Sequence, residues 1–418
     1  MQSVSRVTDI IFLEHTALVN SSLFAPLPPE AYWQPDWLAR ERQEVFFKHW
    51  IFAGFKNQLA QANDYISFTI AGMPVVVRNM NGKLVAFRNV CSHRYSVIHP
   101  TGCGNAMFRC PYHGWTYDAE GVPFGVPDNA KSFGFDNESK RELALDRLAV
   151  DICGNFVFAR VDAEGPPLKQ WLGTFADPLE HISEVLTTVY WTIDQRWSCN
   201  WKNRVEVIAE SYHVPMVHKA TMLKQVDGLV IGGENQNDLP QMDAAVRASD
   251  HEEDVHEEYT GPHSASFTPL RGPVLHHLDS IAKRLHLPFS RRLRGYDHFM
   301  LFPNMMFGIN GGVNMCVERY EPVTPEQTDI HCWLMVGTST KPGVRDGQIW
   351  KTVTKQWIAW TEQVLAEDRG PCESSQSGVH YAQHRALLGK IEGRVRHYQT
   401  TLREDVERQD VTAPMKCA

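Results

Sequence analysis

Two short segments of this 418-residue chain each place one cysteine beside one histidine. Cys91 and His93 form a Cys-x-His pair, and Cys110 and His113 follow after sixteen intervening residues as a Cys-x2-His pair. Thiolates and imidazoles in paired short loops are typical ligands of zinc and of iron–sulfur clusters. The spacing therefore predicts a metal centre held by both loops, with these two kinds of centre as alternatives.

The spacing favours iron over zinc. A structural zinc site usually leaves two or more residues between both members of each ligand pair, whereas Cys91 and His93 leave only one. Each loop also supplies one cysteine and one histidine. That arrangement suits a Rieske-type [2Fe-2S] cluster, in which two cysteines hold one iron and two histidines hold the other.

A second group of candidate ligands lies about 100 residues further along. His213 and His218 are five residues apart, which separates them by about 140° on an ideal helix, too far to chelate one ion comfortably. Pro215 stands between them, and a proline kinks a helix. We expect a helix running from Lys202 toward His218, with a kink at Pro215 that brings the two imidazoles to one centre.

Both patterns resemble one family, the Rieske ring-hydroxylating oxygenases. Residues 90–117, VCSHRYSVIHPTGCGNAMFRCPYHGWTY, are similar to the family's cluster loops, and NWK-x7-E-x2-H-x4-H from Asn200 is similar to its iron-binding helix. Respiratory Rieske proteins carry an extra cysteine in each loop, where this chain has Ser96 and Tyr112. Cys103, between the loops, is interpreted as a free thiol.

The resemblance implies roles for further residues. His213 and His218 would bind a mononuclear Fe(II), with Asp368 as the third ligand and Glu367 as the alternative. Glu210 would orient an imidazole and link the cluster of one subunit to the iron of its neighbour. Many family members have Asp at that place, and Glu occurs in some that act on quaternary amines.

The resemblance also implies an activity. The chain would be the terminal component of an oxygenase that uses O₂ and electrons from NAD(P)H, delivered through a reductase and in some systems a ferredoxin. It would form a homotrimer, in some systems with a beta subunit. Hydroxylation or dihydroxylation of an aromatic or heteroaromatic substrate is the expected reaction, and oxidation of a quaternary amine or N- or O-demethylation is the alternative. Two other classes remain as hypotheses, an electron carrier and an inactive scaffold.

The elements that must position these residues follow from hydrophobic patterning. Short β-branched and aromatic runs with turn signals such as Asn81-Gly82 predict a small antiparallel β domain over 46–160, preceded by an N-terminal helical segment over 1–45. Residues 161–418 form the expected catalytic domain, with strands over 299–337 and two closing helices whose apolar residues recur every three or four positions. The fold class is α+β, with the second antiparallel sheet wrapped around C-terminal helices in a helix-grip arrangement.

Net charge and hydropathy exclude some classes of partner and location. The net charge of −8 and the lack of a long basic block argue against nucleic acid as a partner. We expect neither a secretory signal nor a membrane span, and hence a cytoplasmic protein. The acidic run at 250–258, which contains His251 and His256, is interpreted as a solvated loop.

The substrate pocket is harder to predict. Val207 takes a place where the family often has Asn. Candidate lining residues that would suit a planar apolar substrate are Phe302, Met305, Met306 and Phe307, together with Met222 and Leu223.

Overall fold

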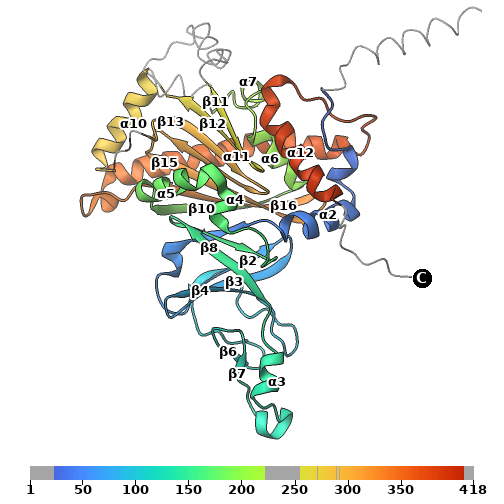
Figure 1. Ribbon diagram of the computed structural model, residues 1–418. Helices are drawn as coiled ribbons and strands as arrows, with labels where there is room; N and C mark the ends of the chain where they lie inside the picture. Colours follow the sequence, from blue (N-terminus) through green and yellow to red (C-terminus); the bar gives the residue numbers. More distant parts are fainter. Residues whose placement is uncertain (1–22, 222–254, 271, 289, 291, 409–418) are drawn as a thin grey trace, which may run out of the picture.

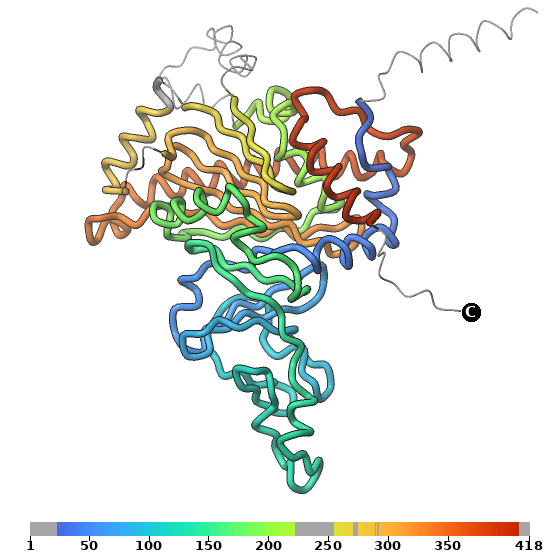
Figure 2. Tube along the Cα trace, in the orientation of Figure 1, coloured from blue at the N-terminus to red at the C-terminus, as the bar shows by residue number. Residues whose placement is uncertain are grey.

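The computed structural model describes residues 23–221, 255–270, 272–288, 290 and 292–408. Within these ranges the chain forms two large antiparallel sheets, one above the other in Figure 1, with helices around the upper sheet. A narrow extension continues from the lower sheet away from the upper one, as the trace in Figure 2 shows.

The lower sheet has seven strands in the order β1-β9-β8-β4-β3-β2-β5. Asn81 and Gly82 connect β3 to β4 with φ angles of 56° and 94°, the left-handed pair that a two-residue hairpin turn needs. The strands are β1 (Ile51–Phe55), β2 (Asp64–Ile70), β3 (Met73–Met80), β4 (Lys83–Arg88), β5 (Gly102–Asn105), β8 (Arg147–Cys153) and β9 (Phe156–Arg160). The extension contains β6 (Thr116–Tyr117), β7 (Pro123–Gly125) and α3 (Asn137–Glu142).

The upper sheet also has seven strands, in the order β10-β16-β15-β14-β13-β12-β11. They are β10 (Thr188–Trp197), β11 (His256–Thr260), β12 (His263–Pro269), β13 (Gly295–Leu301), β14 (Met305–Asn310), β15 (Asn314–Thr324) and β16 (Gln327–Val336). Successive side chains of a strand point to opposite faces. Met305, Phe307 and Ile309 therefore join a buried core with residues of α4 and α5, whereas Met306 lies on the face that turns toward α6 and α11.

The upper sheet has helices on both faces, as Figure 1 shows. Helices α4 (Leu168–Leu172) and α5 (Ala176–Val185) cover one face, and α6 (Trp201–Ile208), α11 (Gln348–Val379) and α12 (Gly393–Glu407) lie against the other. The remaining helices are α2 (Pro35–Glu41), α7 (Val214–Val217) and α10 (Gly272–Arg284). Together these features confirm the α+β class with an antiparallel sheet packed against C-terminal helices.

Two local predictions are wrong. The helix expected to run from Lys202 toward His218 ends at Ile208, and Pro215 lies in the first turn of the separate helix α7. A proline is tolerated there because the first amides of a helix have no partner within the helix, so Pro215 starts a helix rather than kinking one. The predicted loop at 250–258 is strand β11 from His256 onward, although residues 256–259 are exposed. His251 lies outside the described residues.

The two sheets share a buried core. The Phe52 ring of β1 packs edge to face on Trp333 of β16, with the ring centres 5.4 Å apart, and Phe156 of β9 stacks on Phe307. The Gly72 amide, in the turn between β2 and β3, donates a hydrogen bond to Glu321 of β15 at 2.8 Å. The expected boundaries at 45 and 160 remain predictions.

Candidate active site

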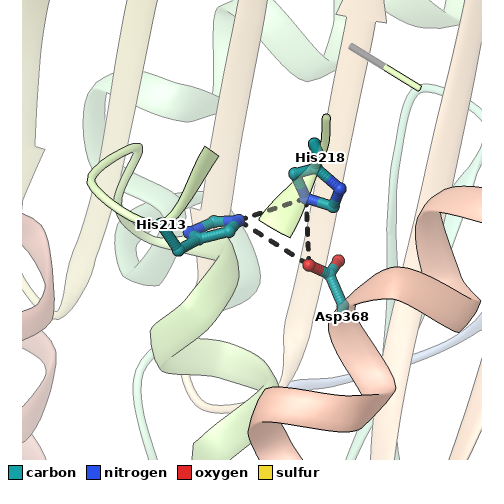
Figure 3. A group of neighbouring side chains, drawn as sticks. All are labelled: His213, His218 and Asp368. Atoms are coloured by element: carbon teal, nitrogen blue, oxygen red, sulfur yellow. Dashed lines mark hydrogen bonds and ion pairs between the residues drawn. The ribbon is translucent and has the colours of Figure 1, made fainter. Parts of the chain in front are cut away.

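Three side chains from distant parts of the chain meet beside the upper sheet (Figure 3). The Nε2 atoms of His213 and His218 are 3.2 Å apart, and Asp368 Oδ1 lies 3.6 Å from the first and 3.0 Å from the second. The two histidines flank the four-residue helix α7, and Asp368 lies in the middle of α11. A single helical turn thus brings together two imidazoles that are five residues apart.

The outer nitrogens of both rings are held by other carboxylates. Nδ1 of His213 donates to Glu210 Oε1 at 2.6 Å, and Nδ1 of His218 donates to Glu367 Oε2 at 2.8 Å. In the neutral rings, both Nε2 lone pairs therefore face Asp368 Oδ1, which is buried and has no hydrogen-bond donor among the described residues. Three acceptors around one point are typical of a cation site, and two histidines with one carboxylate suit Fe(II) with open positions.

Neighbouring charges shift the pKa values of His218 and Asp368. Burial alone would lower the pKa of His218, but the Asp368 and Glu367 carboxylates raise it above its usual value. Burial would likewise raise the pKa of Asp368, whereas Arg204 and His218 hold it below the ordinary range. Asp368 is therefore an anion ready to bind a metal.

Arg204 fixes the orientation of Asp368 and was not predicted from the sequence. Its Nη1 donates to Asp368 Oδ2 at 2.6 Å, while Nε and Nη2 donate to Glu318 of β15. This leaves Asp368 Oδ1 free to face the imidazoles. The only signal in the sequence is the position of Arg204, close after the Asn-Trp-Lys motif.

That motif positions helix α6. The Asn200 side chain caps the helix by accepting a hydrogen bond from the Lys202 amide at 3.0 Å. Trp201 Nε1 and Lys202 Nζ both donate to the buried Glu41 carboxylate of α2, at 2.9 and 2.6 Å. The motif thus anchors the helix from which Arg204 reaches Asp368.

The three candidate ligands border a cavity of about 720 Å³. Alternate residues of the upper sheet line it because one face of each strand points inward. Met306 is one of them, whereas Met305, Phe302 and Phe307 are buried in the core outside the cavity. Val207 also lines it. Met222 and Leu223 lie outside the described residues. The other sheet residues on the wall are Glu257, Ser266, Thr268, Tyr296, His298, Gly308, Asn310, Cys316 and Glu318.

The four candidate cluster ligands sit on two loops with matching backbones. The Cys91 amide donates to Ser96 O and the Tyr95 amide donates back to Cys91 O; in the other loop, Cys110 pairs with Trp115 and Gly114 in the same way. Tyr95 and Gly114, each four residues after the cysteine, have φ angles of 60° and 74°. The backbone around the two cysteines therefore turns in the same way, although His93 follows its cysteine by two residues and His113 by three.

The donor set fits a Rieske cluster. Cys91 and Cys110 are buried, and the ring centres of His93 and His113 are 4.5 Å apart. His93 Nδ1 is buried and has no hydrogen-bond partner within the described part of the chain, as a metal-binding nitrogen would be. Burial raises the pKa of the Cys91 thiol and lowers that of His93, so a positive metal centre is needed to hold the thiolate form. Cys103 is exposed and lies outside this group.

Two known domain families match the chain. Residues 49–143 match the Rieske [2Fe-2S] domain, and residues 183–408 match the catalytic domain of the ring hydroxylating alpha subunit. The second match covers more than half of the chain, which therefore belongs to the ring hydroxylating alpha subunit family.

Several curated relatives are similar in sequence. Choline monooxygenase of Spinacia oleracea is 32% identical over 206 residues, which are 47% of this chain and 46% of the relative. The chain thus matches about half the length of that enzyme. The alpha subunit of chlorobenzene dioxygenase from Cupriavidus sp. (strain PS12) is 27% identical over 338 residues, covering 76% of this chain and 72% of the relative.

Solved structures share the fold. The quaternary ammonium Rieske monooxygenase CntA superposes with a TM-score of 0.70 at 21% identity, covering 91% of this chain and 94% of the other. Naphthalene 1,2-dioxygenase from Rhodococcus sp. gives 0.71 at 18% identity, covering 94% and 97%. Among the described residues, no helix combines the length and the hydrophobicity that crossing a membrane requires.

Proposed function

We propose that this protein is the terminal component of a Rieske oxygenase that hydroxylates a small aromatic or heteroaromatic substrate. Cys91, His93, Cys110 and His113 would bind the [2Fe-2S] cluster, and His213, His218 and Asp368 the mononuclear iron. The observation that carries the proposal is the presence in one chain of both a cluster-type donor set and a separate two-histidine, one-carboxylate site that borders a cavity.

The two centres would cooperate between subunits. When bound, the cluster would supply electrons one at a time, and the iron would offer an open position for O₂. In Figure 1 the extension with β6 lies at the opposite end of the molecule from α7. Because the two sites of one chain are so far apart, we propose that the cluster of one subunit serves the iron of its neighbour in a homotrimer.

Exposed apolar side chains occur at both ends. Tyr95, Met107 and Tyr112, near the cluster loops, are 83%, 65% and 54% exposed, and Tyr212 and Met216, beside the histidine site, are 69% and 71% exposed. Large apolar side chains in such positions are typical of protein interfaces. They support contact between the extension of one subunit and the α7 region of another.

Neighbouring side chains orient the candidate iron ligands and line the cavity beside them. Glu210 and Glu367 hold the two imidazoles in the tautomer that directs Nε2 inward, and Arg204 holds Asp368. Val207, Met306, Val364 and Leu365 provide apolar walls that would exclude water and hold a planar ring.

Oxidation of a quaternary amine is the second candidate. Glu at position 210, together with the similarity to choline monooxygenase, supports it. Tyr296 and Trp360 on the cavity wall are aromatic groups that can attract a cation. However, Arg204 already pairs with Glu318, so this wall carboxylate is not a free partner for an ammonium group.

Metal analysis tests the proposal. We expect roughly three irons and two sulfides per chain in the anaerobically prepared protein, whereas an electron carrier would contain roughly two of each. A substrate screen with a surrogate reductase should then show O₂ and NADH consumption that depends on an added aromatic compound. A content of roughly two irons per chain would contradict the proposal. So would a screen in which no compound stimulates O₂ and NADH consumption and none gives a product.

A further inference from the structure

A second buried arginine, Arg394, lies on the cavity wall. It is in the first turn of α12 and is only 3% exposed. Its three nitrogens make three hydrogen bonds, to Ser264 Oγ at 3.1 Å, to Ser266 Oγ at 3.0 Å and to His298 Nδ1 at 3.2 Å. A guanidinium has five N–H groups, so two of them have no partner among the residues that the structure describes.

All three partners of Arg394 are neutral. His298 accepts through Nδ1, and burial, together with the charges of Arg394 and Arg204, keeps its pKa well below the usual value. Among the described residues, Arg394 forms no ion pair with a carboxylate. Burial lowers the pKa of Arg394 to about 10, so the group is still a cation near neutral pH.

Arg204, which lines the same cavity, is paired with carboxylates, as a buried cation usually is. That arginine is equally buried, but it pairs with both Glu318 and Asp368. The carboxylate whose charge acts most on Arg394 is Glu257, an exposed residue at the edge of the same cavity. Its Oε2 accepts a hydrogen bond from Tyr259 at 2.5 Å and makes no ion pair with Arg394 among the described residues. A buried charge without a partner is costly, and the positive end of the helix dipole adds to the cost in the first turn of α12.

An anionic ligand would remove this cost. Arg394, Asp368 and Tyr296 all line the same cavity. The charges of Arg394 and Asp368 both act on the Tyr296 phenol, so Tyr296 lies near both residues. A small molecule in the cavity can thus contact Arg394 at one end and approach the candidate iron site at the other. Met306 and Leu365 provide apolar wall for its central part.

We propose that Arg394 binds the carboxylate of the substrate, so that the substrate class is a small aromatic or heteroaromatic acid. This proposal rests on the proposed function and specifies its substrate. The two remaining N–H groups would donate to the carboxylate, which is the planar partner that a guanidinium matches best. A quaternary ammonium group would be repelled from the same place.

Two other roles for Arg394 make different predictions. If the residue only fastens α12 to β12 and β13, its replacement should weaken the binding of charged and uncharged ligands alike. If Glu257 turned inward to neutralise Arg394 permanently, acids would have no advantage over their amides. A comparison of matched acids and amides separates these roles from carboxylate binding.

The experiment is calorimetric titration of the metal-loaded protein with benzoate, phenylacetate and nicotinate and with the three corresponding amides. At least one acid should bind the parent more tightly than its amide does. In Arg394→Gln the affinity for that acid should fall roughly 10- to 100-fold, the cost of losing charged hydrogen bonds, while the affinity for the amide changes little. Arg394→Lys, which keeps the charge, should retain part of the preference.

Arg396→Gln is the matched control. Arg396 is on the same helix and donates to backbone oxygens of Phe24, Leu23 and Leu388, away from the cavity wall. This variant should keep the parent's preference for the acid. The proposal is overturned if the parent prefers no acid over its amide, or if it binds choline more tightly than every acid. It is also overturned if Arg394→Gln keeps the preference for the acid, or if that variant loses affinity for acid and amide equally. Because binding is measured without turnover, failure of the oxygenase assignment would show separately, as missing iron or missing product.

Discussion

Two consecutive residues of α11, Glu367 and Asp368, lie at opposite edges of the His218 ring. Glu367 Oε2 lies 2.8 Å from Nδ1, and Asp368 Oδ1 lies 3.0 Å from Nε2, the nitrogen that also faces His213. Adjacent residues of a helix point about 100° apart, so the two carboxylates cannot both face the same point. The geometry favours Asp368 as the metal ligand and Glu367 as the residue that orients the imidazole.

Asp368→Ala should abolish turnover and the binding of mononuclear iron, because it removes one of three ligands. The cluster spectrum should remain. Glu367→Gln should retain some iron and lose about 10- to 100-fold in activity or metal affinity, as changes to residues that orient a ligand do. Iron analysis and product formation measure both effects. Glu362→Gln, an exposed position five residues before Glu367 on the same helix, is the control. Iron loss in Glu367→Gln but not in Asp368→Ala would reverse the assignment.

Cys110→Ala and His93→Ala should each remove the visible and EPR signals of the reduced cluster, since each cluster iron would lose one of two protein ligands. Cys103→Ala is the control and should leave both signals unchanged, because Cys103 is exposed and belongs to neither ligand pair. An unchanged Rieske spectrum in either ligand variant would disprove the cluster assignment.

Glu210→Gln should separate electron delivery from metal binding. An amide side chain keeps the size of the carboxylate but loses its charge, so it should hold the His213 ring less well. Both centres should still load, and the reductase should still reduce the cluster. In a single turnover with substrate and O₂, the cluster should stay reduced much longer than in the parent. Reoxidation with product at the parent's rate would show that Glu210 is not part of the route.

The contact between the two sheets should depend on pH. Burial raises the pKa of Glu321, which accepts from the Gly72 amide, to about 7, compared with 4.5 for an exposed glutamate. The folded state thus binds this proton more tightly than the unfolded chain does. The resulting stabilisation is complete below pH 4.5 and is lost as the pH rises through about 7.

Glu321→Gln imitates the protonated carboxyl group at every pH. The unfolding midpoint of the variant should therefore exceed that of the parent by a few degrees at pH 8, and the difference should shrink at pH 5. Thermal unfolding followed by circular dichroism measures this difference. A midpoint difference that stays constant from pH 5 to pH 8 would contradict the raised pKa.

The sequence by itself determined the chemistry of the ligands. Cysteine and histidine at short, fixed spacing are recognisable because neighbouring residues of one loop reach the same metal centre whatever the rest of the fold does. The strands could also be predicted from the sequence, since alternating apolar residues and turns such as Asn81-Gly82 determine the local backbone conformation. The spacing of His213 and His218 indicated a shared metal site, but the predicted single kinked helix was wrong. The break in the helix comes after Ile208, because α6 is capped and anchored on its own and Pro215 begins a new turn.

Only the tertiary structure decided which distant side chains share the site. Arg204, Glu318 and Arg394 come from α6, β15 and α12. Apart from the position of Arg204 close after the Asn-Trp-Lys motif, nothing in their local sequence marks them, because a buried charge is identified by its partners rather than by its neighbours in the chain. The choice between Glu367 and Asp368 depended in the same way on how α11 is rotated against α7. Strand register likewise placed Met306 in the cavity and Met305 in the core, since a shift of one residue turns a side chain to the other face of the sheet.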